Sequence, residues 1–174
     1  MKKFLLLFFC LFSLLTASMA QKSPQWSKLD FLTNERYFKV ELDYSQVSNN
    51  LSFKTDQEIQ EWESGQSLKE LTNECIKSLN EKLEDRRCHL RASNIKPTNY
   101  RVIIRVTELN KNGNTNADIY FKPVDSDNTL CLKTLYGSGG SHGTTVNLMG
   151  DAIRNIGEAL GRFIDSKTPA LKRK

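Results

Sequence analysis

Apolar and polar residues alternate strictly along residues 37–44. One side of this segment carries Phe38, Val40, Leu42 and Tyr44, and the other carries Tyr37, Lys39, Glu41 and Asp43. A period of two is typical of a β-strand that buries one of its faces. The first predicted element is therefore a strand, which Asn49 and Asn50 bring to an end.

The period then changes to that of a helix. Thr55 is followed three residues later by Glu58, and Ser67 is followed at the same spacing by Glu70. Each pair is a capping box, so two helix starts are predicted. The first helix is short, whereas the second extends to about Arg87 and is amphipathic. Its predicted buried face consists of Leu68, Leu71, Cys75, Ile76, Leu79 and Leu83.

Strict alternation returns over residues 100–107 and again over residues 115–121. Between these two segments, Asn112 and Gly113 can supply the positive φ angles of a tight hairpin. A further strand is predicted over residues 129–136. The three segments together predict an antiparallel meander.

The last predicted element is a helix over residues 147–166, which has one apolar and one polar face. Gly150, Gly157 and Gly161 lie on a narrow stripe beside the apolar face, given 3.6 residues per turn. Each glycine costs a helix about 1 kcal/mol relative to alanine. A row of glycines therefore predicts that another backbone comes very close to this helix.

The element order β-α-α-β-β-β-α predicts an α+β fold. We expect a two-layer sandwich in which two long helices cover one face of a four-stranded, mostly antiparallel sheet. The other face would carry Lys39, Glu41, Asp43, Arg101, Arg105, Asp118, Tyr120, Lys122 and Lys133. If a partner binds this face, the residues predicted to contact it are Tyr37, Ile103, Arg105 and Tyr120.

Residues 1–20 have the features of an export signal. Two lysines precede an apolar run over residues 4–15, and small side chains stand at Ser18 and Ala20, the positions that a signal peptidase inspects. The run is shorter than the roughly 20 residues that span a membrane. We expect a signal peptide cleaved after Ala20 and a periplasmic or secreted protein with no membrane insertion after cleavage.

Residues 21–166 are expected to form a single α/β domain, followed by a disordered basic tail over residues 167–174. The chain carries 25 basic and 20 acidic side chains, but several of the basic ones belong to the leader and the tail. The domain itself is close to neutral. Nucleic-acid-binding proteins owe their affinity to a concentrated basic surface, so we expect no nucleic-acid partner.

Three cysteines follow the leader, namely Cys75, Cys88 and Cys131. An oxidising compartment permits one disulfide and leaves one thiol over. Cys75 lies in the apolar stripe of a predicted helix and is expected to be a buried thiol. The candidate disulfide therefore joins Cys88 and Cys131, with three free thiols as the alternative.

A glycine-rich segment connects the last predicted strand to the last predicted helix, which is where phosphate-cradling loops occur. It lacks the lysine of a P-loop and the third glycine of a dinucleotide fingerprint. A flexible connector is the ordinary interpretation, and generic anion binding at the helix N-terminus is the alternative. The candidate anion loop consists of Gly139, Gly140, Ser141, His142, Gly143, Thr144 and Thr145.

Neither histidine has a cluster of other ligands at metal-binding spacing, so no metal site is predicted. His89 lies beside Cys88, and His142 lies beside Ser141. Adjacent side chains of an extended segment point in opposite directions, which disfavours a nucleophile and base pair at either place. Without a nucleophile, a base and an orienting group, we expect a non-enzymatic protein that uses no cofactor.

The end of the chain carries a recognisable pattern, in which a glycine-rich linker after a meander leads into a helix that begins Asn-Leu-Met-Gly-Asp. The residues are Val146, Asn147, Leu148, Met149, Gly150, Asp151, Ala152, Gly157, Leu160, Gly161, Phe163 and Ile164. This pattern resembles the ending of a group of small secreted proteins of unknown function from Gram-negative anaerobes. The resemblance implies a periplasmic or envelope location and an α/β sandwich, but it implies no activity, cofactor or catalytic residue.

These features favour an exported, non-enzymatic domain that binds an envelope component through its open sheet face or its glycine-rich loop. The alternative is a small-ligand or anion-binding protein that uses residues 139–145. The sequence favours no particular oligomeric state.

Cleavage after Ala20 leads to the first testable prediction. The exported protein should have the intact mass of residues 21–174 and the N-terminal sequence Gln-Lys-Ser-Pro. Mass spectrometry of the protein released from the envelope by osmotic shock measures this directly. Recovery of the uncleaved chain in the membrane fraction would contradict it.

Overall fold

The computed structural model describes residues 29–47 and 51–168. The predicted signal peptide and its cleavage position after Ala20 lie outside these residues, as does residue 169 onward. Residues 167 and 168, which were predicted to belong to the disordered tail, are ordered. Lys167 is the last residue of a helix, and Thr168 is buried, with its hydroxyl donating a hydrogen bond to the carbonyl oxygen of Ile164.

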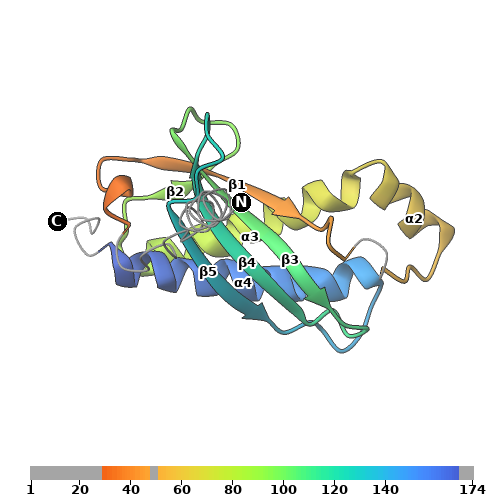
Figure 1. Ribbon diagram of the computed structural model, residues 1–174. Coiled ribbons are helices and arrows are strands. Elements are labelled where there is room, and N and C mark those ends of the chain that lie inside the picture. Colours follow the sequence, from red (N-terminus) through yellow and green to blue (C-terminus); the bar gives the residue numbers. More distant parts are fainter. Residues whose placement is uncertain (1–28, 48–50, 169–174) are drawn as a thin grey trace, which may run out of the picture.

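Five strands and three α-helices make up the described part of the chain (Figure 1). The elements are η1 (Asp30–Leu32), β1 (Tyr37–Asp43), α2 (Asp56–Glu63), α3 (Gln66–Asp85), β2 (Arg91–Ala92), β3 (Tyr100–Leu109), β4 (Thr115–Pro123), β5 (Cys131–Gly137) and α4 (Thr145–Lys167). The strands form one sheet in the order β2-β1-β3-β4-β5.

The α+β class is confirmed, but the sheet is not the predicted four-stranded, mostly antiparallel one. It has five strands, and β1 pairs in parallel with both β2 and β3. The additional strand, β2, has only two residues and is too short to leave a periodic signal in the sequence. The parallel pairs arise because α2 and α3 carry the chain back between β1 and β3, and parallel strands require such a crossover. The antiparallel meander of β3, β4 and β5 is as predicted.

One side of the sheet contributes to a single apolar core. Pairing aligns Val40 with Val102 and Ile104 with Ile119, and all four side chains are fully buried. Helix α3 lies against β1, α4 lies against β5 and β4, and the two helices pack along each other. They add to the core Leu71, Cys75, Leu79, Leu83, Met149, Ile153, Ile156, Leu160 and Ile164.

Only one of the two predicted capping boxes forms. The Thr55 hydroxyl accepts a hydrogen bond from the backbone N–H of Glu58 at 3.2 Å, as predicted. The second prediction is wrong, because α3 begins after Gly65, has no side-chain cap, and contains Ser67 as a buried residue of its first turn. Helices α2 and α3 are separated only by Ser64 and Gly65, so the left-handed backbone of Gly65 sets the start of α3.

The glycine row of α4 meets α3 at very short range, as predicted for two of its three positions. An ideal Cβ on Gly157 would lie 2.2 Å from the Ser78 hydroxyl oxygen and 2.8 Å from the Cys75 carbonyl oxygen. A Cβ on Gly161 would lie 2.8 Å from the Lys82 Cβ. At Gly150 the nearest atom would be 3.8 Å away, which is an ordinary van der Waals contact.

These distances predict opposite effects of the same substitution at two positions. Gly157→Ala should lower the free energy of unfolding by about 2 kcal/mol, because a clash with backbone costs more than the gain in helix propensity. Gly150→Ala should be neutral or stabilising by up to about 1 kcal/mol. Urea unfolding followed by circular dichroism measures both, and equal effects at the two positions would contradict the prediction.

Candidate functional site

The side of the sheet opposite the core carries a grid of mostly polar side chains, which we call the outer sheet face. Its central row aligns Glu41, Ile103, Tyr120 and Leu132 across β1, β3, β4 and β5. The flanking rows contain Lys39, Arg101 and Lys122 on one side, and Asp43, Arg105, Asp118 and Thr134 on the other. An apolar strip on β3, β4 and β5 therefore lies between charged rows.

The Tyr120 ring lies against two cations. The Arg105 guanidinium carbon is 5.1 Å from the ring centroid, and the Lys122 ammonium nitrogen is 5.9 Å from it. Arg105 is itself held by Asp43, because its Nε donates to the Asp43 carboxylate at 2.7 Å. The backbone N–H and hydroxyl of Ser45 donate to the other oxygen of that carboxylate, at 2.9 and 2.6 Å. These contacts hold the aromatic ring at the centre of the face in a fixed orientation.

Partial burial acts to raise the pKa of Asp43, but the hydrogen bonds from Ser45 and Arg105 outweigh it. The pKa of Asp43 therefore lies below its usual value, and the ion pair with Arg105 persists into mildly acidic solution.

Three of the four residues predicted on this face come together, since Ile103 pairs with Tyr120 in register and Arg105 lies over the Tyr120 ring. Tyr37 does not join them. It pairs with Arg91 of β2 at the start of β1, and its ring lies 5.6 Å from the Arg36 guanidinium carbon. Tyr37 therefore shares the predicted face but lies away from the Tyr120 ring.

The predicted phase of the last strand was wrong by one residue. Lys133 pairs with Ile119, whose side chain is in the core, so Lys133 belongs to the core side of this edge strand. Leu132 pairs with Tyr120 and lies on the outer sheet face. Leu132 was missed because the irregular segment before β5 has no alternation of apolar and polar residues that would show which side chains of β5 face outward.

The glycine-rich loop is packed against its neighbours and does not act as a loose connector. The Gly139 backbone N–H donates to the Asn114 side chain at 2.7 Å, which ties the loop to the β3–β4 turn. The Asn155 side chain of α4 donates to the carbonyl oxygen of Ser138 at 2.8 Å. The start of the glycine-rich run is therefore held by two side-chain amides, those of Asn114 and Asn155.

Ser141 and His142 contact each other, contrary to the expectation for an extended segment. The Ser141 hydroxyl oxygen lies 2.8 Å from His142 Nδ1, because the loop bends here. Both residues are exposed, and no acidic side chain of the described residues is hydrogen-bonded to His142. The pair therefore lacks the orienting group that a nucleophile and base arrangement needs.

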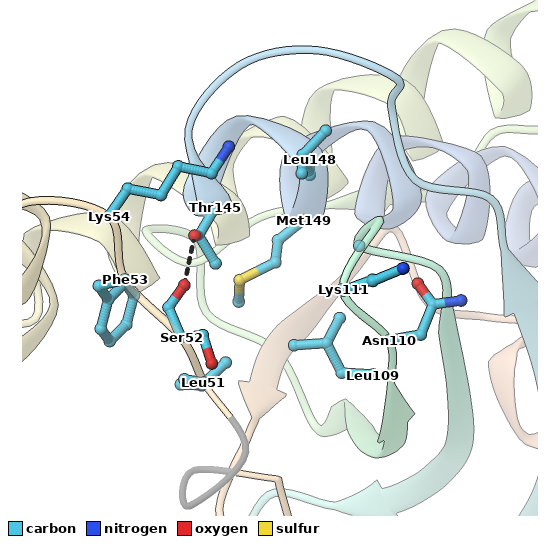
Figure 2. Close-up of a pocket in the computed structure, with 11 residues that line it drawn as sticks. Leu51, Ser52, Phe53, Lys54, Leu109, Asn110, Lys111, Thr145, Leu148 and Met149 are labelled. Atoms are coloured by element: carbon cyan, nitrogen blue, oxygen red, sulfur yellow. Dashed lines mark hydrogen bonds between the residues drawn. The ribbon is translucent and has the colours of Figure 1, made fainter.

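The N-terminus of α4 already holds an anion, which is the Glu58 carboxylate of the chain itself (Figure 2 shows the surroundings of Thr145). Glu58 is only 5% exposed. Its Oε1 accepts from the Thr145 backbone N–H at 2.8 Å, and its Oε2 accepts from the Lys54 backbone N–H at 2.7 Å. Thr144 caps the helix by accepting from the Asn147 N–H at 3.2 Å.

This arrangement bears on the last residue of the predicted anion loop over residues 139–145. The Thr145 N–H at the helix N-terminus, which could bind an external anion, already donates to a carboxylate from α2, 87 residues earlier in the chain. Sequence analysis placed Glu58 correctly in a capping box but could not show that the same carboxylate serves a second helix.

Desolvation acts to raise the pKa of Glu58, but hydrogen bonds from the backbone N–H groups of Lys54, Thr145, Val146 and Thr55 outweigh it. The pKa of Glu58 therefore lies below its usual value of 4.5. Because the folded state favours the charged carboxylate, the stabilisation is complete above the unfolded pKa and is lost as the pH falls through the lower folded pKa.

The three described cysteines are free, buried thiols, so the structure does not contain the predicted disulfide between Cys88 and Cys131. Cys88 comes just before β2 at one edge of the sheet, whereas Cys131 begins β5 at the opposite edge. Burial raises the pKa of both thiols, and it raises the pKa of Cys75 to about 12. The thiols are therefore protonated and unreactive in the folded state.

Within residues 29–47 and 51–168, no group of three or more histidine, cysteine or acidic side chains could hold a metal ion. In the same part of the chain, no helix is both long and apolar enough to cross a membrane.

No family model matches the chain, and no curated protein matches it. Among solved structures, it is similar to the PelC dodecamer from Paraburkholderia phytofirmans, with 10% identity and a TM-score of 0.40 over 87% of this chain and 95% of that one. A likeness this distant carries no information about ligand, partner or assembly.

The shared carboxylate predicts a pH-dependent loss of stability. Glu58→Gln should lower the free energy of unfolding at pH 7 by about 2 kcal/mol, because hydrogen bonds to a charged acceptor are lost. The difference from the wild type should shrink as the pH falls below 4.5, where the wild-type carboxylate becomes protonated.

Urea unfolding at pH 7 and pH 3 provides the measurement, with Glu81→Gln on the exposed side of α3 as the control. A difference between wild type and Glu58→Gln that is the same at both pH values would rule out a charged cap.

Proposed function

We propose that this protein is an exported, non-enzymatic domain that binds an envelope component through its outer sheet face. The observation that carries the proposal is the ordered Tyr120 ring, which is paired with Ile103 and held between Arg105 and Lys122. Aromatic and arginine side chains dominate the binding energy of protein interfaces. A ring that is already held in place loses little conformational freedom on binding.

The charge pattern supports a directional contact. Three basic side chains, Lys39, Arg101 and Lys122, lie along one side of the apolar strip and outnumber their two ion-pair partners among the described residues, Glu41 and Asp127. On the other side, Arg105 stands between Asp43 and Asp118. A partner with the complementary charges would be oriented across the strands, because the reversed orientation would place like charges together.

The leader over residues 1–20 and the resemblance to secreted proteins of Gram-negative anaerobes support the envelope as the place of action. The lack of an orienting group at His142 and the raised thiol pKa values support a binding role over a catalytic one.

Site-specific photo-cross-linking in the cell tests the proposed face. A benzophenone amino acid at Leu132, on the outer sheet face, should give a discrete adduct with an envelope protein. The same group at Lys77, an exposed position of α3, should give none.

A second substitution tests which residue drives the contact. Tyr120→Ala should reduce the Leu132 adduct several-fold, because it removes the ordered ring, while circular dichroism shows that the fold persists. Ile95→Ala is the control, because Ile95 is apolar and 92% exposed but lies outside the outer sheet face, and it should leave the adduct unchanged. Equal adducts from Leu132 and Lys77, or an adduct insensitive to Tyr120→Ala, would refute the proposal.

A further inference from the structure

A separate hollow of about 350 Å³ opens between three segments that are far apart in the sequence. Its walls are residues 51–54 before α2, the end of β3 with its turn, and the first turn of α4 (Figure 2). This volume lies at the lower end of the range for ligand sites, which is roughly 300–1,000 Å³.

The floor of the hollow is apolar. Met149 is fully buried and Leu148 is 7% exposed. Figure 2 shows Met149 and Leu109 reaching into the gap from opposite sides, with Leu51 and Phe53 at its edge. A flexible thioether in such a position adapts to apolar ligands of differing shape.

Two lysines, Lys54 and Lys111, also line the hollow. Lys54 Nζ donates a hydrogen bond to the carbonyl oxygen of Gly143, which leaves two of its three donors. Among the described residues, neither lysine forms an ion pair, and none of the lining residues is acidic. The Glu58 carboxylate, which bonds to the Lys54 backbone, is occupied by N–H groups.

The walls are held together without a ligand. The Thr145 hydroxyl donates to the Ser52 carbonyl oxygen at 2.8 Å, a contact drawn in Figure 2. Glu58 joins the same two segments through the backbone N–H groups of Lys54 and Thr145. A pocket formed in advance costs little ordering when a ligand binds.

We propose that this hollow, the lysine pocket, binds a single-chain amphipathic carboxylate. The alkyl chain lies against Met149, Leu109 and Leu148, and the carboxylate stays at the rim, where the exposed ammonium groups of Lys54 and Lys111 attract it from either side. The apolar floor favours an alkyl group, and the two exposed lysines, which form no ion pair among the described residues, favour an anion. The volume excludes ligands with two long chains. This inference is independent of the outer sheet face and assigns the protein a second binding activity.

The methyl group of Met149 is a direct reporter of binding. The methionines of the chain are Met1, Met19 and Met149, so the described residues give a single methyl resonance after ¹³C-methyl methionine labelling. Met149→Leu assigns it. Titration with decanoate below its micelle concentration should shift this resonance saturably, whereas decylamine should cause no saturable shift.

Chain length and charge distinguish a pocket from nonspecific association. Affinity should rise by at most about fourfold for each added CH₂ from hexanoate upward, and it should level off once the hollow is full. Decanol should bind about two- to fivefold more weakly than decanoate, since it keeps the chain and loses the charge.

Two lysine variants and a matched control complete the test. Lys111→Gln and Lys54→Gln should each weaken decanoate binding by about two- to fivefold and leave decanol binding unchanged. Lys96→Gln, on an exposed loop outside the pocket, should change neither. The proposal is overturned if the Met149 resonance does not shift, if affinity rises with chain length without levelling off, or if Lys96→Gln has the same effect as Lys111→Gln.

Discussion

The close contact between α3 and α4 at Gly157 and Gly161 is the constraint on which the rest of the structure depends. Two long helices cover a sheet in which only β2 is short, and side chains at both glycines would push the helices apart. Because α4 lies so close to α3, it reaches Gly137 of β5 with Ala152 and Ile156 and still shares a core with β1. The position of α4 in turn sets where its N-terminus meets the loop before α2.

That meeting point has to satisfy the backbone groups of two helix starts at once. The first N–H groups of a helix have no partner within the helix, and leaving them buried and unpaired is costly. A single carboxylate, Glu58, accepts from Lys54 before α2 and from Thr145 at the start of α4. The glycine-rich loop therefore ends at an electrostatically satisfied helix, and the remaining positive charge lies with Lys54 and Lys111 beside it.

Sequence alone predicted the elements that have strong periodic patterns. Alternation located β1, β3 and β4, and with them the Ile103 and Tyr120 pair, because a buried face fixes the register. The glycine spacing predicted the close helix contact. Other predictions failed because a local pattern was too short or a contact too distant in the sequence. Strand β2 has only two residues, and the irregular segment before β5 hides which of its side chains face the core. The second role of Glu58 was missed because it acts on a helix 87 residues away. The Ser67 capping box failed because α3 begins after Gly65, which places Ser67 inside the first turn of the helix.

The parallel pairing of β1 with β3 has a consequence for the order of folding. The Asp43 and Arg105 ion pair joins residues 62 positions apart, whereas β3, β4 and β5 pair through short turns. Closing a long loop costs more chain entropy than closing a short turn, and it slows folding. The meander can therefore form first as a local unit, and β1 can dock only after α2, α3 and β3 have been synthesised. The pairing of β1 with β3 at the centre of the sheet therefore cannot form until most of the chain has been synthesised.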